Sequence, residues 1–222
     1  DYRTIVLAPN SVQENADMAY EAFDLAEKYR HPVIVASDAA IGQMVEAVEL
    51  KEFKEHDINT YDWAVRGRKD DEPRRTAENV YYAMGADNYK EYLLKKYQEI
   101  EETEQRWESF CTEDAEIVLV AYGISSRVSK EAVKIARAKG LKLGLIRPRT
   151  LWPYPRKAFD ALRDSVVGFL SVEMSILGQM VDDIKLATDG KYPVHCYNEF
   201  ANVPEPDIAI QMAEDMLKQY KK

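Results

Sequence analysis

The chain has 222 residues, of which 46% are hydrophobic, so it can bury a core in one or two domains. A formal net charge of −9 and a pI near 5.0 argue against nucleic acid as a partner, because phosphate contacts need clustered Lys and Arg. The sequence has neither the ~18-residue apolar run of a membrane span nor a signal-peptide pattern, so we expect a cytoplasmic protein without a membrane partner.

The first 50 residues form half of an α/β domain in this interpretation. Residues 4–7 are a short apolar strand, and Ser11 with Glu14 forms a capping box that opens a helix. A second buried strand, residues 33–36, ends at Asp38. Two strands and one helix cannot cover both faces of a parallel sheet. We therefore expect residues 1–50 to be the carboxy-terminal half of a domain whose other half lies outside this sequence or comes from another chain.

Residues 51–112 have a different character, with dense charges of both signs and few apolar residues. The run GRKDDEPRR at residues 67–75 predicts an exposed loop. A single apolar stripe within residues 89–110 then predicts one long helix that bridges the two α/β parts. Its charges form either a solvated face or a surface that binds a partner.

The last region, residues 113–222, alternates strands with helices. The apolar run at residues 117–121 predicts a buried parallel strand, followed by a helix that ends at Gly140 and a second strand that stops at Arg147. Two more strands, at residues 167–172 and 194–197, alternate with further helices, one of them centred on Leu177, Val181 and Ile184. Four strands with covering helices predict a three-layer αβα domain with a parallel-rich sheet.

Four candidate site residues lie where two of these strands end. Gly123, Ser125 and Ser126 join a strand to a helix N-terminus, where free N–H groups favour an anion. The P-loop lysine and the glycine triplet of dinucleotide folds are missing, so a turn glycine followed by Ser125 as N-cap is the alternative. Because parallel strands end at the same edge, Arg147 should share this rim.

Two carboxylates complete the candidate set. Glu173 closes a strand and either points into the rim or hydrogen-bonds the start of the next helix, near Ser175. Asp38 either joins the rim or caps a helix at residues 39–42. The residues support neither a catalytic assignment nor a metal site, since no His pairs with a nucleophile.

The two cysteines, Cys111 and Cys196, are too few for an iron–sulfur cluster or a structural zinc site in this chain alone. Their number allows one disulfide, although reduced thiols are expected in the cytoplasm. Cys196 follows a histidine in a predicted buried strand, where a cysteine usually behaves as a small hydrophobe. We expect neither cysteine to be a nucleophile.

Seven sequence words follow one another along the whole chain: IVLAPNSVQE, HPVIVASD, YDWAVRG, KYQEIEETEQRWESF, VLVAYGISSR, GLIRPRTLWPYP and VEMSILGQM. In this order they resemble the alpha-type subunit of 2-oxoacid:ferredoxin oxidoreductases, and most closely the 2-ketoisovalerate (3-methyl-2-oxobutanoate) branch. The last three words lie in a second domain that is similar to the C-terminal domain of transketolases. The resemblance implies that residues 1–50 belong to a pyrimidine-binding-type domain, residues 51–112 to a linker and residues 113–222 to the transketolase C-terminal-like domain.

The resemblance implies oxidative decarboxylation of a 2-oxoacid to an acyl-coenzyme A, with electrons passed to ferredoxin. The family complex uses thiamine diphosphate, magnesium and iron–sulfur clusters, with coenzyme A as a substrate. The Gly-Asp-Gly word that holds the magnesium diphosphate is missing here. In the family this group lies on a separate beta-type subunit, so we expect no cofactor to be bound by this chain alone and no catalytic residue to lie in it.

The partners that the resemblance implies are the thiamine-binding beta-type, the gamma-type and the ferredoxin-like delta-type subunits, in a homo- or hetero-oligomer. Two rival interpretations remain open. One is a non-catalytic scaffold or assembly domain, and the other is the equivalent domain of a transketolase or of a 2-oxoacid dehydrogenase beta chain. The fold alone does not separate them.

Overall fold

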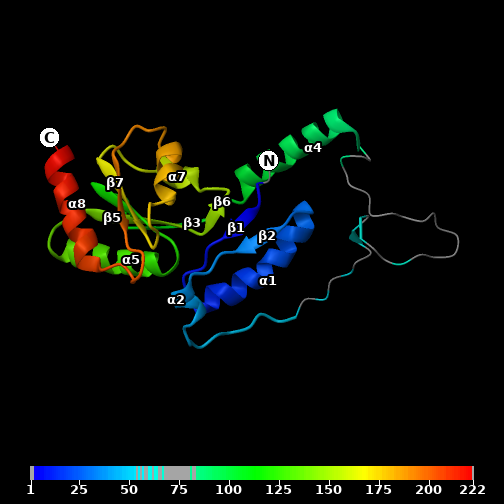
Figure 1. Ribbon diagram of the computed structural model, residues 1–222, viewed down its shortest axis with the longest axis horizontal. Helices are drawn as coiled ribbons and strands as arrows, with labels where there is room; N and C mark the ends of the chain where they lie inside the picture. Colours follow the sequence, from blue (N-terminus) through cyan, green and yellow to red (C-terminus); the bar gives the residue numbers. More distant parts are fainter. Residues whose placement is uncertain are drawn as a thin grey trace.

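A computed structural model of the chain describes residues 3–53 and 84–221, together with positions 55, 57, 60, 61, 63, 64, 67 and 81 (Figure 1). The predicted exposed loop at residues 67–75 therefore lies, apart from Gly67, outside the described residues. Within them no helix is both long and apolar enough to cross a membrane.

A small sheet occupies the amino-terminal part. Its strands have the order β2-β1-β6 and are Ile5–Leu7 (β1), Val33–Val35 (β2) and Thr150–Trp152 (β6). The first two are parallel, whereas β6 pairs with β1 in the antiparallel sense and comes from the far end of the sequence. Helices α1 (Val12–Tyr29) and α4 (Ala86–Thr103) lie on opposite sides of these strands (Figure 1). A short helix, α2 (Ala39–Gly42), follows β2.

The core of this part is apolar and small. It contains Ile5 and Leu7 of β1, three residues of α1 and Ile100 of α4. Ile100 has 0% exposure, so the amphipathic stripe of the long helix is used against this sheet. The predicted α/β half-domain is thus present, and α4 packs against it.

Five strands form the second sheet, in the order β3-β5-β4-β7-β8. They are Trp107–Phe110 (β3), Ile117–Val120 (β4), Leu143–Pro148 (β5), Gly168–Glu173 (β7) and Val194–Asn198 (β8). All run parallel except β3, which is antiparallel to β5. Every residue of β4 and β7 is buried, as expected for parallel strands that are covered on both faces.

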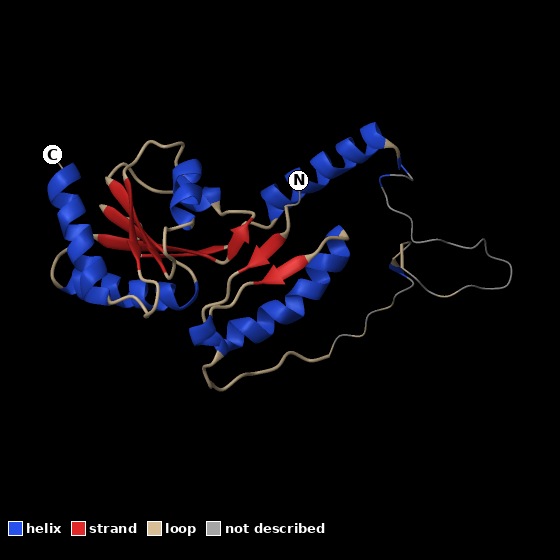
Figure 2. Cartoon of the chain, viewed as in Figure 1, coloured by secondary structure: helices blue, strands red, loops and turns tan. Residues whose placement is uncertain are grey.

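Two helices cover each face of this sheet (Figure 2). They are Gly123–Ala138 (α5) with Pro206–Tyr220 (α8) on one face, and Arg156–Asp160 (α6) with Met180–Ala187 (α7) on the other. Small residues such as Ala132 and Ala136 let α5 approach the strands closely. The structure therefore confirms the predicted three-layer αβα architecture with a parallel-rich sheet.

Three predicted boundaries were wrong. The long helix ends at Thr103 rather than at residue 110, because Trp107–Phe110 pairs with β5. Trp107 fits the helical spacing by coincidence, and tertiary pairing decides its state. The strand that was predicted to stop at Arg147 runs on to Pro148, and the chain then forms β6 in the other sheet. Finally, Leu177 precedes α7, which begins at Met180.

Strands β3 and β6 thus cross the divisions expected from composition. The antiparallel edge strand β3 lies in the predicted linker but belongs to the second sheet, and β6 lies in the predicted last domain but belongs to the first. The division at residues 50 and 112 stays a prediction. The structure shows that β6, from the last region, belongs to the first sheet, so the two sheets are connected by strand pairing as well as by the linker.

Candidate functional site

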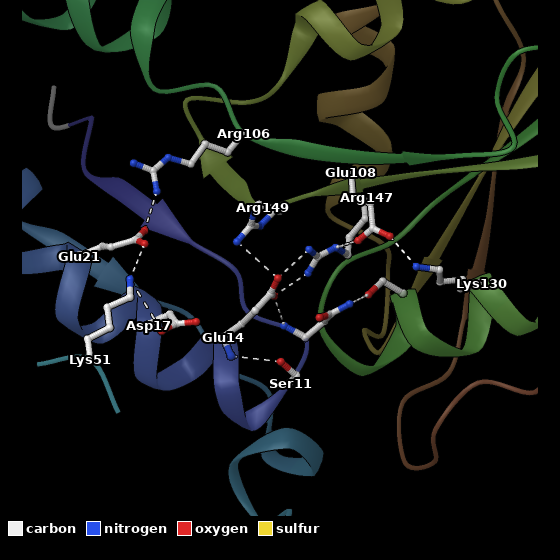
Figure 3. A network of polar contacts seen from close by, with 12 residues as sticks. Ser11, Glu14, Asp17, Glu21, Lys51, Arg106, Glu108, Lys130, Arg147 and Arg149 are labelled. Carbon is white, nitrogen blue, oxygen red and sulfur yellow. Dashed lines mark hydrogen bonds and ion pairs between the residues drawn. The ribbon is translucent and has the colours of Figure 1, made fainter. Parts of the chain in front are cut away.

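The carboxyl ends of strands from both sheets meet at one place. Asn10 and Asp38 follow β1 and β2 in the first sheet, and Gly123 and Arg147 lie at the ends of β4 and β5 in the second. The structure therefore links four of the six predicted site residues by hydrogen bonds and close contacts, namely Asp38, Gly123, Ser126 and Arg147. We call this contact the polar seam, made of Asn10, Glu14, Asp38, Gly123, Ser126 and Arg147. Figure 3 shows Glu14 and Arg147 at its centre.

Asp38 uses both of its carboxylate oxygens inside the protein. Its Oδ1 accepts a hydrogen bond from Ile41 N at 2.9 Å, so it caps α2 as the second alternative predicted. Its Oδ2 accepts from Ile124 N at 2.7 Å, at the start of α5. The N–H groups of a helix N-terminus favour an anion. At α5 that anion is a carboxylate from the neighbouring sheet.

Gly123 lies directly against Asp38 of the other part. Its φ of +58° lies in the left-handed region, which a side chain rarely adopts. A Cβ atom added there would overlap Asp38 Oδ2. Glycine is thus required both by the backbone conformation and by the carboxylate that lies against it.

The two serines of this turn behave differently from the prediction. Helix α5 begins at Gly123 with Tyr122 at the N-cap position, so Ser125 is not the N-cap. The helix begins earlier because Asp38 supplies, from another element, the acceptor that a capping side chain would provide. Ser125 is buried, and Ser126 Oγ donates to Gly123 O at 2.7 Å and accepts from Asn10 Nδ2 at 3.2 Å.

Arg147 is the charged centre of the seam, with only 3% of its surface exposed. Its two terminal nitrogens donate to the carboxylate of Glu14 at 2.7 and 2.9 Å, a bidentate pair across the two sheets. Its Nε lies 3.0 Å from Glu108 Oε2 without the alignment of a hydrogen bond. Glu108 also binds Lys130 at 2.6 Å (Figure 3).

Glu14 is the seam residue whose role the sequence did not reveal. The predicted capping box is half confirmed, because Ser11 Oγ accepts from Glu14 N at 3.1 Å. The Glu14 carboxylate does not return that bond, and instead accepts from Asn10 N at 3.0 Å and from Arg147. The available signal was Arg147 itself, since a guanidinium at the end of a buried strand requires a carboxylate partner.

The electrostatics of the seam depend on this pair. Burial raises the pKa of the Glu14 carboxyl, but the hydrogen bonds and charge of Arg147 outweigh burial, so the pKa is lowered from 4.5. The pKa of Glu108 is lowered in the same way, with burial opposed by Lys130 and Arg147. Both carboxylates are therefore ionised near neutral pH, and the buried guanidinium has negative charge beside it.

Glu173, at the end of β7, forms its hydrogen bonds with residues outside the seam. Its Oε2 accepts from Gln179 N at 2.7 Å and Met180 N at 3.1 Å, and its Oε1 accepts from Ser171 Oγ at 2.6 Å. It therefore anchors the start of α7, as one of the two alternatives predicted. Burial and then the nearby charge of Glu173 raise the pKa of Cys196 to about 12, so this thiol is not a nucleophile near neutral pH.

Two family models match the chain on either side of residue 112. The model described as "Pyruvate flavodoxin/ferredoxin oxidoreductase, thiamine diP-bdg" matches residues 1–110, and "Pyruvate:ferredoxin oxidoreductase core domain II" matches residues 115–212. The chain belongs to this family of 2-oxoacid:ferredoxin oxidoreductases, as the sequence words indicated.

Individual relatives agree with this assignment. The chain is 50% identical over 194 residues to the ketoisovalerate oxidoreductase subunit VorB of Methanothermobacter marburgensis, which covers 85% of this chain and 53% of that protein. It thus spans about half the length of the curated relatives that it matches. A 2-oxoglutarate:ferredoxin oxidoreductase from Magnetococcus marinus has the same fold, with a TM-score of 0.71 and 19% identity over 96% of this chain and 42% of that chain.

The transketolase-like fold is also confirmed. The structure of a split-gene transketolase, described as an inactive beta4 tetramer, matches with a TM-score of 0.53 and 14% identity, covering 97% of this chain and 58% of that one. At this identity the likeness concerns the fold alone.

The polar seam does not fit the diphosphate of a thiamine cofactor. The N-terminus of α5 holds Asp38, and the space beside Gly123 is filled by the same carboxylate. Arg147 is bound to Glu14 and buried. A diphosphate would have to displace Asp38 and take an arginine from its partner. A ligand-binding role for the six candidate residues stays a prediction.

Replacing Gly123 with alanine tests how closely the two parts approach. We expect Gly123→Ala to lower the free energy of unfolding by about 3 kcal/mol, since it adds backbone strain and displaces the Asp38 carboxylate. Gly140→Ala is the matched control, because Gly140 has a φ of +85° but open space around its Cβ position. It should cost only about 1–2 kcal/mol.

Urea unfolding at neutral pH measures both variants. In an Asp38→Ala background the added Cβ atom no longer meets the carboxylate. The losses in free energy of unfolding caused by Gly123→Ala and Gly140→Ala should then differ by less than about 0.5 kcal/mol. Equal costs of the two substitutions in the wild-type background would contradict the close contact between Gly123 and Asp38.

Glu14→Gln tests the charge of the seam through pH. A carboxyl whose pKa is lowered by folding contributes stability above its unfolded-state pKa and loses it as pH falls through the folded-state value. We expect the variant to be less stable by about 2 kcal/mol at pH 7, with this deficit shrinking as pH falls below about 4.5. Urea midpoints at pH 7 and below pH 4.5 measure the difference.

The control is Glu131→Gln, in an exposed pair with Lys134, which should change stability by less than about 0.5 kcal/mol at either pH. A Glu14→Gln deficit that does not depend on pH would show that the carboxylate charge contributes nothing to the seam.

Proposed function

We propose that this chain is part of a thiamine-diphosphate-dependent 2-oxoacid:ferredoxin oxidoreductase that acts on branched-chain 2-oxoacids, with 3-methyl-2-oxobutanoate as the representative substrate. The reaction breaks the bond between the carboxylate and the 2-oxo carbon, releases carbon dioxide and forms a thioester with coenzyme A. Two electrons leave for ferredoxin. The observation that carries this proposal is the 50% identity to a ketoisovalerate oxidoreductase subunit along 194 residues.

The preference for a branched substrate over 2-oxoglutarate rests on the same comparison. The 2-oxoglutarate synthase subunit KorA of Methanothermobacter marburgensis is 31% identical over 222 residues, well below the 50% of the ketoisovalerate subunit. The identity also favours an oxidoreductase over the two rivals, a transketolase-type enzyme and a pure scaffold.

Within the complex, this part would be non-catalytic. The described residues at the seam hold one another, so we assign them a structural role beside a shared active site. The chemistry that the cofactor supplies, stabilisation of a carbanion after decarboxylation, would take place where the beta-type subunit binds the diphosphate. The gamma-type and ferredoxin-like delta-type subunits would complete the complex, and the clusters would lie outside this chain.

The chain by itself should neither bind the cofactor nor turn over a 2-oxoacid. Specific binding at 100 times the dissociation constant would add ~2.7 kcal/mol to stability and raise the melting temperature by roughly 5–10 °C. With saturating thiamine diphosphate and magnesium we expect a shift below about 1 °C. A shift of several degrees that Gly123→Ala abolishes would show a complete cofactor site within this chain.

The full-length subunit, assembled with its companion subunits, should reduce ferredoxin in the presence of 3-methyl-2-oxobutanoate and coenzyme A. We expect its kcat/KM to be at least ~10-fold higher than with 2-oxoglutarate, whose second carboxylate needs a charged partner that an apolar pocket lacks. Omission of coenzyme A is the control. Equal or better use of 2-oxoglutarate would overturn the substrate assignment but not the reaction class.

A further inference from the structure

Exposed apolar side chains gather on the two loops that leave β7 and β8. They are Met174, Ile176, Leu177, Phe200 and Val203, and Ile208 continues the group in the first turn of α8. The loops are neighbours, because Glu173 pairs with Asn198 in the sheet and Asn198 Nδ2 donates to Ile176 O at 3.1 Å. Leu177 has 88% of its surface exposed and Ile176 has 68%. Exposed apolar groups at one place on a protein usually mark an interaction site.

The first of these loops is held in one conformation. Its Gly178 N donates to Ser175 Oγ at 3.0 Å, and the next backbone N–H groups donate to Glu173. Gly178 has a φ of +78°, and a Cβ atom there would lie 2.9 Å from Cys196 Sγ. These hydrogen bonds therefore fix a loop whose two large apolar side chains, Ile176 and Leu177, are exposed. A surface ordered in advance loses little entropy on binding.

The two segments that contain these apolar residues carry only acidic charges, and Lys185 follows the first segment directly. Residues 174–184 contain Asp182 and Asp183, residues 199–208 contain Glu199, Glu205 and Asp207, and neither segment contains Lys, Arg or His. Among the described residues, Asp182 pairs with Lys185, whereas the other four carboxylates form no ion pair. We call the two loops together the acid-rimmed face.

We propose that the acid-rimmed face is the docking surface for a different polypeptide, whose contact surface has an apolar centre bordered by lysine and arginine side chains. A second copy of this chain is disfavoured as the occupant, because self-association through this face would place carboxylates against carboxylates. The identity of the partner rests on the proposed function: we take it to be the thiamine-binding companion subunit.

Binding of the purified companion subunit to the immobilised full-length chain tests the proposal. Leu177→Asp and Ile176→Asp should each weaken binding at least ~30-fold, as expected for the centre of an interface. Phe23→Asp is the matched control, since Phe23 is 70% exposed but lies on α1, outside the face. It should bind like the wild type, and all three variants should melt within about 2 °C of the wild type.

The rim is tested by charge reversal. Glu199→Lys should weaken binding and reduce its dependence on salt, whereas Glu131→Lys, on the exposed side of α5, should do neither. If the wild type binds the companion and Leu177→Asp binds equally well, the proposal is overturned while the proposed function stands. Homodimers that Leu177→Asp dissolves would assign the face to a second copy and overturn it. No binding by the wild type would overturn both.

Discussion

The two sheets of this protein are joined around one buried positive charge. Arg147 ends a strand of the second sheet with almost no exposed surface, and a guanidinium in that position must be neutralised. Its partner, Glu14, comes from the first helix of the other part, 133 residues away in sequence. Next to this pair the chain segments that follow β1 and precede β6 are also joined, since Ala8 N donates to Arg149 O at 2.9 Å and Arg149 lies 3.4 Å from Glu14.

This requirement decides what the seam can do. Strand ends of parallel sheets are the usual place for a ligand site, and the predicted residues do lie there. However, their polar groups are turned toward the neighbouring sheet: Asp38 binds the start of α5, Ser126 binds Asn10, and Arg147 binds Glu14. Polar groups that already satisfy one another give a rigid support for a site nearby. The proposed role as a non-catalytic part of a shared active site follows from this use of the seam.

The fold was largely predictable because it depends on local patterns. The uninterrupted apolar run of β4 and the small-residue face of α5 are visible in the sequence, and both were predicted with their correct neighbours. What could not be predicted depends on contacts between distant residues. Trp107–Phe110 and Thr150–Trp152 are too short to show a period of their own, so only their partner strands make them β3 and β6. Ser125 and Leu177 were misplaced because Asp38 and Glu173, from other elements, determine where α5 and α7 begin.

The central claim is that the Glu14–Arg147 pair couples the two sheets, and a double-mutant cycle in urea unfolding tests it most directly. Glu14→Ala, Arg147→Ala and the double variant should give a coupling free energy of about 2–3 kcal/mol, with a single cooperative transition in the wild type. The exposed pair Lys134 and Glu131 provides the reference cycle, with coupling below about 0.5 kcal/mol. Additivity of Glu14→Ala and Arg147→Ala within about 0.5 kcal/mol would contradict the account, because the sheets would then be held together by other contacts.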